Sequence, residues 1–247
     1  MSRSSRPDNP RESAIGRRVA KIDWDQVAGQ LDQRGYALPG SLLSARECTA
    51  LARLFPDDTH FRSTIDMEPR RFGDGRYRYF SYPLPNAVAE LRAALYPPLS
   101  RIANRWQEQL GTGEHFDPAL DDFLARCHRA GQPRPTPLLL QYGPGGYNRL
   151  HQDVYGPVAF PLQVAVLLAR PDVDFGGGEL LLLENRARMQ SRGHAIRLEQ
   201  GQALIFPNRL RPVAGPRGFA RAEMRHGVSD VTHGERLTLG VIFHDAK

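Results

Sequence analysis

The feature that most constrains the fold is a change of pattern near Thr136, where short apolar runs separated by turn sequences replace helical spacing. These runs are too short for helices, and several alternate apolar with polar residues as half-buried strands do. Glycine-rich and charged segments between them predict turns. About seven or eight strands are expected in all, and the clearest runs are LLLQY, PLQVAVLLA, ELLLLEN, HAIRLE, QALIFP and RLTLGVIF. A block of short antiparallel strands predicts a barrel or jelly roll.

The first half of the chain has helical patterns with recognisable ends. Apolar residues recur at helical spacing from Asp23 to Gln33, and Gly35 follows where a helix would stop. Ser44 and Glu47 form the sequence signature of a capping box, so they predict the start of a second helix. A short extended segment is expected between the two.

Two further helical regions are expected before the strands begin. Helical spacing continues from Asn86 to Trp106, where Pro97 and Pro98 predict a break or a new helix start. Asp117 followed by Pro118 predicts the N-cap and first residue of the next helix. Helices followed by a block of strands indicate the α+β class, with helices packed against the barrel or jelly roll.

The length of 247 residues and a hydrophobic content of 40% allow one sizeable core. We expect a single domain over residues 21–247, with helical support in 21–135 and the strand core in 136–247. Residues 1–20 are rich in Ser, Arg, Pro and Asn, so a disordered basic tail is expected there.

Cysteine usage and hydropathy favour a cytoplasmic protein. Cys48 and Cys127 lie far apart in segments with helical patterns, which provides neither a disulfide framework nor a zinc cluster. The N-terminus has no apolar run behind its basic residues, and no other window approaches the apolar length of a membrane helix. We therefore expect neither a signal peptide nor a membrane-spanning segment, and no membrane partner.

The chain is basic, with a formal net charge of +6 and a sequence pI near 9.7. Lys21 and Lys247 are its only lysines, so arginine supplies nearly all of the positive charge. The planar guanidinium suits phosphates, carboxylates and aromatic faces, which favours a polyanionic partner. A chain-wide arginine bias can equally arise from codon composition, and both explanations stay open.

The segment YNRLHQDVYG contains the most informative polar pair, His151 and Asp153. In a strand, residues i and i+2 lie on one face, so this imidazole and carboxylate can bind one cation. The pair follows a glycine-rich bend at residues 143–146, which suits the mouth of a jelly roll. A second His-x-Asp triplet, beginning at His115, is discounted because its aspartate is expected to cap a helix.

A third ligand must come from a distant strand, since two ligands leave most of the coordination sphere open. Two histidines and one carboxylate are typical of non-haem Fe(II), which leaves positions for a 2-oxo acid and O2. His226 and Arg236 are expected to lie opposite each other across an antiparallel hairpin, which would place a cation near the metal. Arg236 could then bind the far carboxylate of 2-oxoglutarate. The candidate third ligands are His194, His226, His233 and His244.

These residues resemble a known family, the 2-oxoglutarate and Fe(II)-dependent dioxygenases, and in particular its prolyl-hydroxylase-like branch. The matching segments cover about residues 35–245: GYALPGSLLSAREC, LQYGPGGYNRLHQD, DFGGGELLLLE, QALIFPN and HGVSDVTHGERLTLGVIFH. The resemblance implies a double-stranded β-helix, which is a jelly roll. Within the superfamily the chain looks most similar to a bacterial family of oxygenases proposed to act on damaged nucleic acid.

Carried onto this sequence, the resemblance implies a shared metal and co-substrate site. His151, Asp153 and His226 match the iron ligands. Arg236 matches the residue that binds the 2-oxoglutarate carboxylate, and Tyr142 matches the tyrosine that hydrogen-bonds the same carboxylate. The implied cofactors are Fe(II), 2-oxoglutarate and O2, with ascorbate as a further candidate.

The sequence also departs from the family. The segment RLRPVAGPRGFARAEMRHG is longer than the usual link to the distal histidine. The chain lacks the second inward arginine, in an Arg-x-Asn-x-x-x-x-Arg pattern, that marks the well-known alkylated-DNA repair dioxygenases. These departures affect the substrate assignment and leave the cofactor chemistry unchanged.

A segment from Met67 to Pro85 interleaves arginines with aromatic residues. In the family the equivalent region is commonly a substrate lid, and cations beside aromatic faces suit an unpaired or extruded nucleotide. We therefore expect oxidative removal of alkyl groups from damaged nucleic acid, such as alkylated DNA. The same pattern also describes an ordinary half-exposed hairpin. The candidate substrate residues are Arg70, Arg71, Phe72, Tyr77, Arg78 and Tyr79.

Two alternative functions stay open. The prolyl-hydroxylase-like spacing of HGVSDVTHGER favours a prolyl or other protein or amino-acid hydroxylase. The non-enzyme alternative is a cupin-like metal-binding module, which predicts metal binding without co-substrate binding.

Overall fold

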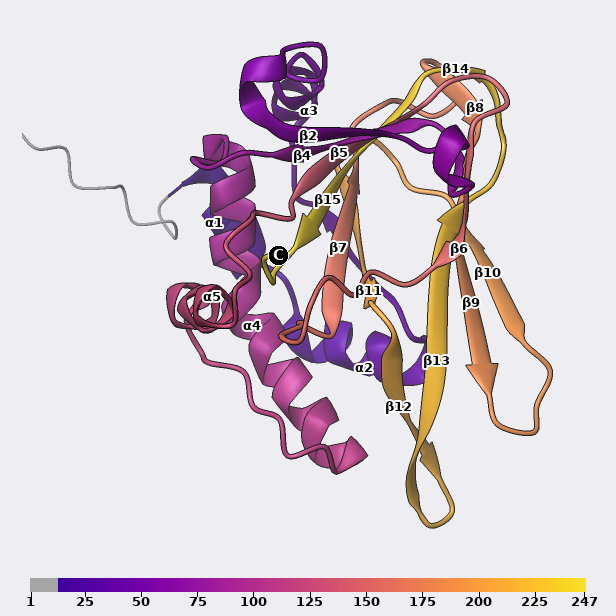
Figure 1. Cartoon of the computed structure of the whole chain (residues 1–247). Coiled ribbons are helices and arrows are strands. Elements are labelled where there is room, and N and C mark those ends of the chain that lie inside the picture. Colours follow the sequence, from indigo (N-terminus) through magenta and orange to yellow (C-terminus); the bar gives the residue numbers. More distant parts are fainter. Residues whose placement is uncertain (1–12) are drawn as a thin grey trace, which may run out of the picture.

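The computed structural model describes residues 13–247 of the chain. Two β-sheets face each other, and the helices gather on one side of the larger sheet (Figure 1). The helices are α1 (Ala14–Ala20), α2 (Trp24–Arg34), α3 (Ala45–Ala52), α4 (Asn86–Leu110) and α5 (Leu120–Arg129), with 3-10 turns η1 (Asp58–His60) and η2 (Glu68–Arg70).

The larger sheet has seven strands in the order β1-β11-β7-β15-β5-β4-β2, and each neighbouring pair is antiparallel. The first half of the chain therefore contributes strands as well as helices, since β2 and β4 form a hairpin before Thr136. The strands are β1 (Ala37–Ser41), β2 (Phe61–Asp66), β4 (Arg76–Phe80), β5 (Leu138–Tyr142), β7 (Leu162–Leu167), β11 (Gln202–Pro207) and β15 (Arg236–Ile242).

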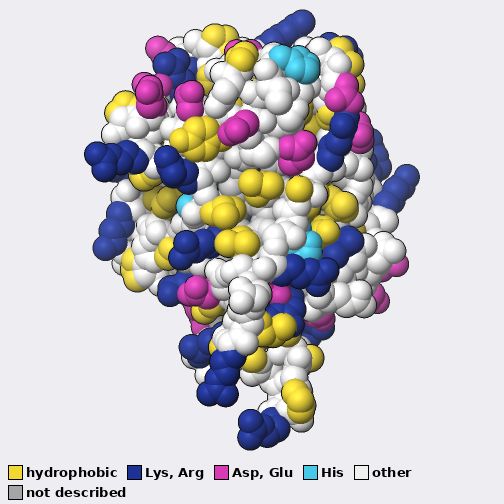
Figure 2. All heavy atoms as spheres, turned by 90° about the vertical axis from the view of Figure 1, so that its right-hand side faces the viewer, with side chains coloured by type: hydrophobic (Ala, Val, Ile, Leu, Met, Phe, Trp, Pro, Cys, Tyr) yellow, Lys and Arg dark blue, Asp and Glu magenta, His cyan; other side chains and the backbone are white. Residues whose placement is uncertain are grey.

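The smaller sheet has the order β10-β9-β13-β6-β3, with β12 paired to β13, and is also antiparallel. Figure 2 views the molecule from the side that this sheet forms, where protruding hairpins narrow its lower end. The mostly antiparallel sheets with few helices are consistent with the expected jelly roll. The remaining strands are β3 (Gly73–Asp74), β6 (Tyr147–His151), β9 (Leu180–Arg186), β10 (Arg192–Ile196), β12 (Leu210–Gly215), β13 (Gly218–Val228), and the pair β8 (Phe175–Gly177) and β14 (Val231–Gly234).

Two buried clusters lie on the two faces of the larger sheet. Along β7, Val164 and Val166 belong to the cluster that the helices cover, because alternate residues of a strand face opposite sides. Ala165 and Leu167 belong to the other cluster, which includes Leu182 and other residues of the smaller sheet. The space between the sheets is therefore partly packed, and the rest of it forms the cavity described below.

Local helix signals in the sequence are confirmed. Asp23 caps α2 by accepting a hydrogen bond from the Gln26 amide at 2.9 Å, and Gly35 ends that helix with a φ of 80°. Ser44 and Glu47 form the predicted capping box at the start of α3. These features depend on neighbours within four residues, which is why the sequence alone predicts them.

Cys48 lies in α3 and Cys127 in α5, as the helical patterns predicted. Both cysteines are buried and have free thiols. None of the helices within residues 13–247 is both long enough and apolar enough to cross a membrane.

The expected disordered tail is wrong over Ala14–Ala20, which form α1. Ser13 caps this helix by accepting a hydrogen bond from the Gly16 amide at 2.9 Å. Ile15 and Val19 are buried in the core that α1 shares with α4, because their spacing places both on one helical face. The prediction of a tail followed the composition of residues 1–20 as a whole, which does not reveal this short helical pattern. Residues 1–12, the rest of the expected tail, lie outside the described residues.

The expected break at Pro97 and Pro98 is also wrong, because α4 continues through both prolines as one helix of 25 residues. An interior proline removes a helical hydrogen bond and costs about 3 kcal/mol. The buried face continues on both sides of the prolines, with Leu95 and Leu99 fully buried. Burying such side chains contributes about 1.5–3 kcal/mol each, which offsets the cost.

The predicted cap of the next helix is wrong as well. α5 begins at Leu120, after Ala119, and the Asp117 side chain does not cap it. The reason for discounting the triplet at His115 therefore fails, although His115 is exposed and lies outside the cluster of metal-binding side chains described next.

Candidate active site

His151, Asp153 and His226 come together on the smaller sheet. His151 ends β6, and His226 is its direct partner on the antiparallel neighbour β13, so both side chains leave the same face. Asp153 follows in the loop after β6. His226 Nε2 lies 3.0 Å from Asp153 Oδ2, and His151 Nε2 lies 3.6 Å from Asp153 Oδ1. The three ligand atoms all lie within 4.8 Å of one another, which one cation could satisfy.

Neighbouring groups orient these side chains. His151 Nδ1 lies 2.7 Å from the Arg149 carbonyl oxygen, and only a protonated Nδ1 can donate there, which leaves Nε2 with its lone pair. The Tyr155 hydroxyl donates a hydrogen bond to Asp153 Oδ1. Metal-binding side chains commonly have such partners, which fix the tautomer and the orientation of each ligand.

The electrostatics favour the deprotonated forms that bind a metal. Burial and the nearby His226 ring lower the pKa of His151 below its usual 6.5, so this imidazole is neutral at pH 7. Burial opposes ionisation of Asp153, but His226 and the Tyr155 hydroxyl keep the pKa of this carboxyl well below its usual range. Two imidazoles and one carboxylate fit the donor set of non-haem Fe(II).

Arg236 and Tyr142 form a second polar group on the larger sheet. They are direct partners on β15 and β5, and the guanidinium carbon lies 5.7 Å from the tyrosine ring centroid. Arg236 is 2% exposed; its Nη1 donates to Thr238 Oγ1 at 2.6 Å, while its Nε has no hydrogen-bond partner. Burial lowers the pKa of Arg236 to about 10, so the side chain stays cationic at neutral pH. A buried cation with an unpartnered donor suits an anionic ligand.

Both groups line one cavity of about 450 Å³ between the two sheets. The triad lies on the smaller sheet and the Arg236 group on the larger one, so a small dicarboxylate could contact both. The volume is within the usual range for small-molecule sites.

The structure corrects the expected hairpin between His226 and Arg236. β13 pairs with β6, β9 and β12, whereas β15 pairs with β5 and β7, and the short β14 that separates them in sequence pairs with β8. The two residues therefore belong to different sheets and meet across the cavity. The turn sequence between them suggested a hairpin, but the chain uses that turn to cross from one sheet to the other.

The candidate substrate residues divide into two groups. Arg71, Phe72, Tyr77 and Tyr79 line the cavity, as the hypothesis required. Arg70 lies in η2, is exposed and does not line it.

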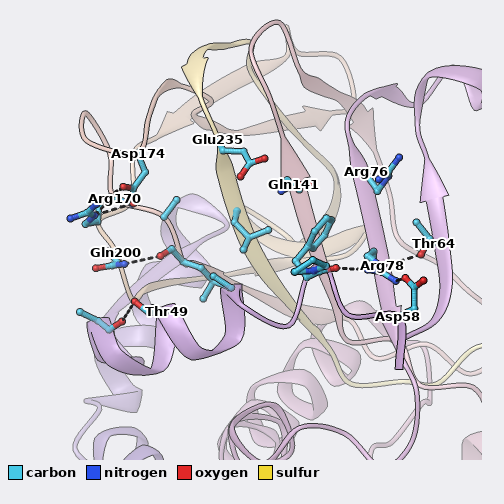
Figure 3. Close-up of a pocket in the computed structure, with 17 residues that line it drawn as sticks. Thr49, Asp58, Thr64, Arg76, Arg78, Gln141, Arg170, Asp174, Gln200 and Glu235 are labelled. Atoms are coloured by element: carbon cyan, nitrogen blue, oxygen red, sulfur yellow. Dashed lines mark hydrogen bonds and ion pairs between the residues drawn. The ribbon is translucent and has the colours of Figure 1, made fainter. Parts of the chain in front are cut away.

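Arg78 contradicts the prediction because it lies on the opposite face of β4. Strand alternation that directs Tyr77 and Tyr79 into the cavity directs Arg78 outward. There its side chain donates to Thr64 Oγ1 at 3.0 Å, to the Phe55 carbonyl and to Asp58. Arg78 lines a separate, open hollow of about 1120 Å³, which none of the triad residues lines. Figure 3 shows Arg78 there, beside Thr64 and Asp58.

The other candidate histidines are elsewhere. His194 packs edge-on against Tyr36, and His233 lies on β14. His244 is buried, and its Nδ1 accepts a hydrogen bond from the Phe160 amide at 3.1 Å. Within residues 13–247, the triad of His151, Asp153 and His226 is the single cluster of three side chains able to hold a metal.

Three residues that the sequence analysis did not single out also line the cavity. Tyr155 contacts Asp153, Asn148 donates to the Tyr142 hydroxyl at 3.2 Å, and Gln163 Nε2 lies 3.4 Å from His226 Nε2. Tyr155 could have been found from its position two residues after Asp153. Nothing local distinguishes Asn148 or Gln163, because their role depends on which strands become neighbours.

Comparison with known proteins agrees with this picture. Residues 75–246 match the family described as "Oxygenase, catalysing oxidative methylation of damaged DNA". Proteins from two strains of Mycobacterium tuberculosis, both described as uncharacterized, are 46% identical over 183 residues, which is 70% of this chain and 78% of each relative.

Several solved structures share the fold. A prolyl-4-hydroxylase from Pseudomonas putida has a TM-score of 0.51 and 17% identity, covering 90% of this chain and 100% of that one. A 2OG-Fe(II) family oxidoreductase from Burkholderia pseudomallei has a TM-score of 0.51 and 15% identity, covering 92% and 96%. The α-ketoglutarate-dependent epimerase SnoN of nogalamycin biosynthesis has a TM-score of 0.55 and 12% identity, covering 90% and 82%.

The triad and the buried arginine thus line one cavity, in a fold that this chain shares with these enzymes. The family match then identifies the family of oxygenases to which the chain belongs. The chain belongs to the oxygenase family whose model covers residues 75–246, more than half of its length.

Proposed function

We propose that this oxygenase uses Fe(II) and 2-oxoglutarate to remove alkyl groups from damaged nucleic acid by oxidation. The observation that carries the proposal is the single cavity, in which the triad, Arg236 and several aromatic side chains meet. The family description, which names damaged DNA, supports the substrate class.

We assign the metal ligands to His151, Asp153 and His226. Bound Fe(II) would supply the activation of O2 that couples decarboxylation of 2-oxoglutarate to insertion of oxygen into a substrate C–H bond. The Arg149 carbonyl and the Tyr155 hydroxyl hold two of these ligands in place through the hydrogen bonds described above. The protein thus presents a prearranged donor set at the cavity wall.

We assign the co-substrate anchor to Arg236, with Tyr142 beside it. The unpartnered Arg236 Nε and the retained positive charge suit the far carboxylate of 2-oxoglutarate. Because Tyr142 Oη accepts from Asn148, its own proton is available to donate to the same carboxylate.

We assign substrate contact to Arg71, Phe72, Tyr77 and Tyr79. The ring centroids of Tyr77 and Tyr79 lie 5.5 Å apart at an edge-to-face angle, and Phe72 is 47% exposed. An extruded base could stack on these rings while Arg71 contacts a phosphate.

The reaction consumes one O2 and one 2-oxoglutarate for each alkyl group removed. One oxygen atom enters succinate as CO2 leaves, and the other is inserted into the C–H bond next to the base nitrogen. The resulting hemiaminal loses its C–N bond, which regenerates the base N–H and releases an aldehyde. The chain's part is to position the two substrates and keep water out of the cavity.

We also infer that the two facing sheets form a double-stranded β-helix core over residues 136–247. Residues 21–135 would supply helical support and a substrate lid in the same domain, and α1 extends that support to residue 14. The buried free thiols of Cys48 and Cys127 support function in a reducing cytoplasm.

The test supplies Fe(II)-loaded protein with 2-oxoglutarate, O2, ascorbate and methylated single-stranded or duplex DNA, and follows succinate and formaldehyde. We expect both products only when every component is present, and a chelator should abolish them. Failure of the metal-loaded protein to bind 2-oxoglutarate by titration would overturn the cofactor assignment. A stable gain of one oxygen on a proline-rich peptide, with no action on DNA, would overturn the substrate class.

A matched pair of variants tests the substrate residues. Phe72→Ala should raise KM for methylated DNA because a stacking surface is removed, by about fivefold or more. Val173→Ala serves as the control, since Val173 is 67% exposed and does not line the cavity. Equal effects of the two substitutions would contradict the assignment.

A further inference from the structure

The segment that departs from the family pattern folds into a hairpin that projects from the smaller sheet (Figure 1). β13 pairs with β9 only from Ala222 to Val228, so residues 218–221 and their β12 partners form a two-stranded extension. We call residues 209–225 the long arm. The neighbouring β9–β10 hairpin, residues 186–192, projects from the same sheet and is called the short arm.

The exposed side chains of the two arms are strongly basic. Glu223 is the only acidic residue in either arm. Figure 2 shows dark-blue side chains along and at the tip of the lower protrusions, on the side of the molecule that the smaller sheet forms. None of the exposed arginines forms an ion pair with any residue that the structure describes; they are Arg188, Arg192, Arg209, Arg217, Arg221 and Arg225.

The long arm is held rigidly at its base. Arg211 on β12 is 0% exposed and forms an ion pair of 2.5 Å with the buried Glu184 on β9. The same guanidinium donates to the Asp32 carbonyl at the end of α2 at 2.9 Å. The base of the arm therefore has a fixed direction relative to the cavity, which positions the strands that carry its exposed arginines.

The arm also points away from the triad along a single strand. Phe219, Arg221 and Arg225 lie on one exposed face of β13, since alternate strand residues share a face. This is the outer face of the strand, and His226 lies on the inner one, so a bound chain would reach these side chains outside the cavity. At a rise of about 3.3 Å per residue, Arg221 lies roughly 17 Å and Arg217 roughly 30 Å along the chain from His226. At about 3.4 Å per phosphate in a stacked strand, 30 Å corresponds to roughly nine nucleotides. The arm is thus placed for the chain that flanks a target nucleotide.

We propose that the two arms form a second contact surface that binds the phosphates of single-stranded nucleic acid flanking the nucleotide in the cavity. This deepens the proposed function and rests on it for the identity of that nucleotide. A single strand fits because Phe219 is 49% exposed and unpaired bases can stack on its ring. Met189 on the short arm, 65% exposed, adds an apolar surface for van der Waals contact. In a duplex those base faces are already covered.

The test measures binding of a fluorescent, undamaged single-stranded oligonucleotide of about 20 nucleotides to the full chain across a series of salt concentrations. The arm variant carries Arg188→Ala, Arg217→Ala and Arg221→Ala. The control variant carries Arg46→Ala, Arg53→Ala and Arg101→Ala, which removes the same charge from exposed sites on the helical side. The slope of log K against log salt is negative, and for a single strand its magnitude falls by about 0.7 for each phosphate that the protein no longer neutralises. We therefore expect the magnitude of the slope to fall by about 2 in the arm variant, which lacks three arginines.

Three further measurements sharpen the outcome. Phe219→Ala should weaken binding about fivefold or more without changing the salt slope, because stacking is not ionic. An oligonucleotide of about 3 nucleotides should bind wild type and arm variant equally, since it cannot reach the arm tips. Thermal unfolding of each variant confirms that the fold is intact.

Equal slopes for the arm and control variants would overturn the proposal, and so would tighter arm-dependent binding of a duplex. The binding assay needs no turnover, so it separates this proposal from the proposed function. If formaldehyde is released but the arm variant binds the oligonucleotide as the wild type does, only the proposal of the arm surface is overturned. If binding depends on the arms but no formaldehyde is released, only the proposed dealkylation reaction is overturned.

Discussion

His226 and His151 are direct partners across the antiparallel pair of β13 and β6, and their ring centroids lie 4.2 Å apart. The pairing places both imidazoles on one face, and a slip of one residue would move one of them to the other face. The donor set therefore depends on the register of two strands whose paired histidines are more than 70 residues apart in the chain. A substitution at either histidine should therefore affect metal binding first.

His226→Ala should abolish tight metal binding, because it removes one of the three donor atoms. Loss of an outer partner alone typically costs 10- to 100-fold in affinity, so loss of a ligand should exceed about 100-fold. Titration with Fe(II) under anaerobic conditions, or with Co(II) and its visible spectrum, measures this. His194→Ala and His233→Ala are the controls, and weaker binding in either, with normal binding in the His226 variant, would contradict the ligand assignment.

Arg236→Ala should raise the 2-oxoglutarate requirement and spare the metal. Truncating one member of a buried charge pair costs about 2–5 kcal/mol, which is roughly 30-fold or more in the dissociation constant. Titration of metal-loaded protein with 2-oxoglutarate gives that constant directly. Arg236→Lys should recover part of the affinity, since it restores the charge without the planar fork. Equal loss of metal and co-substrate binding would indicate a folding role instead.

Tyr155→Phe should weaken metal binding by about 10- to 100-fold, because the hydroxyl that holds Asp153 in place is removed. Tyr147→Phe is the matched control, since its hydroxyl only accepts a hydrogen bond from the exposed Arg149 side chain. Co(II) titration of both variants compares them. Identical affinities would show that Asp153 is positioned without Tyr155.

What the sequence predicted correctly is mostly local or carried by the resemblance. The capping box of Ser44 and Glu47 and the glycine stop of α2 depend on interactions within a few residues. The resemblance and the expected pairing with Arg236 both favoured His226 among four candidate histidines. The structure brings His226 to His151 and Asp153, although its strand pairs with β6 and not with the strand of Arg236.

The failures share a different cause. Arg78 was assigned to the substrate with its neighbours because the segment was treated as one patch, whereas strand alternation sends Tyr77 and Arg78 to opposite faces. The hairpin expected between His226 and Arg236 failed because turn residues do not specify which strand is paired. Partner strands depend on the packing of the whole sheet.

The ion pair between Arg18 and Glu47 should make stability sensitive to acid. Burial opposes ionisation of Glu47, but hydrogen bonds from Arg18 and Ser44 lower the pKa of this carboxyl below its usual 4.5 in the folded protein. A lowered folded-state pKa contributes stability above the unfolded pKa, and that contribution is lost as pH falls through the folded pKa. Arg18→Gln should therefore reduce the free energy of unfolding by up to about 1 kcal/mol at pH 7 and by less below pH 4.

Urea unfolding at the two pH values measures this difference. Arg46→Gln is the control, because Arg46 precedes Glu47 on helix α3, is exposed and makes no ion pair with any residue in 13–247. A loss for Arg18→Gln that is the same at both pH values would contradict a contribution from the Glu47 charge. Any measurable loss at pH 7 would also show that α1 is part of the folded domain.

Arg211→Ala should be the most destabilising of these substitutions, because it leaves Glu184 buried without its main cation. Removing one partner of a buried pair costs about 3–5 kcal/mol, and the lower end applies because Arg186 still contacts the same carboxylate. A loss of about 3 kcal/mol corresponds to a fall of roughly 10 °C in Tm for a chain of this size. Arg209→Ala, on an exposed side chain two residues away, should change stability by less than about 0.5 kcal/mol.

The double variant Arg211→Met with Glu184→Leu should recover most of the loss, since no buried charge is then left alone. Thermal and urea unfolding of the three variants decides the matter, and a shift below about 1 kcal/mol for Arg211→Ala would mean that this pair does not anchor the long arm.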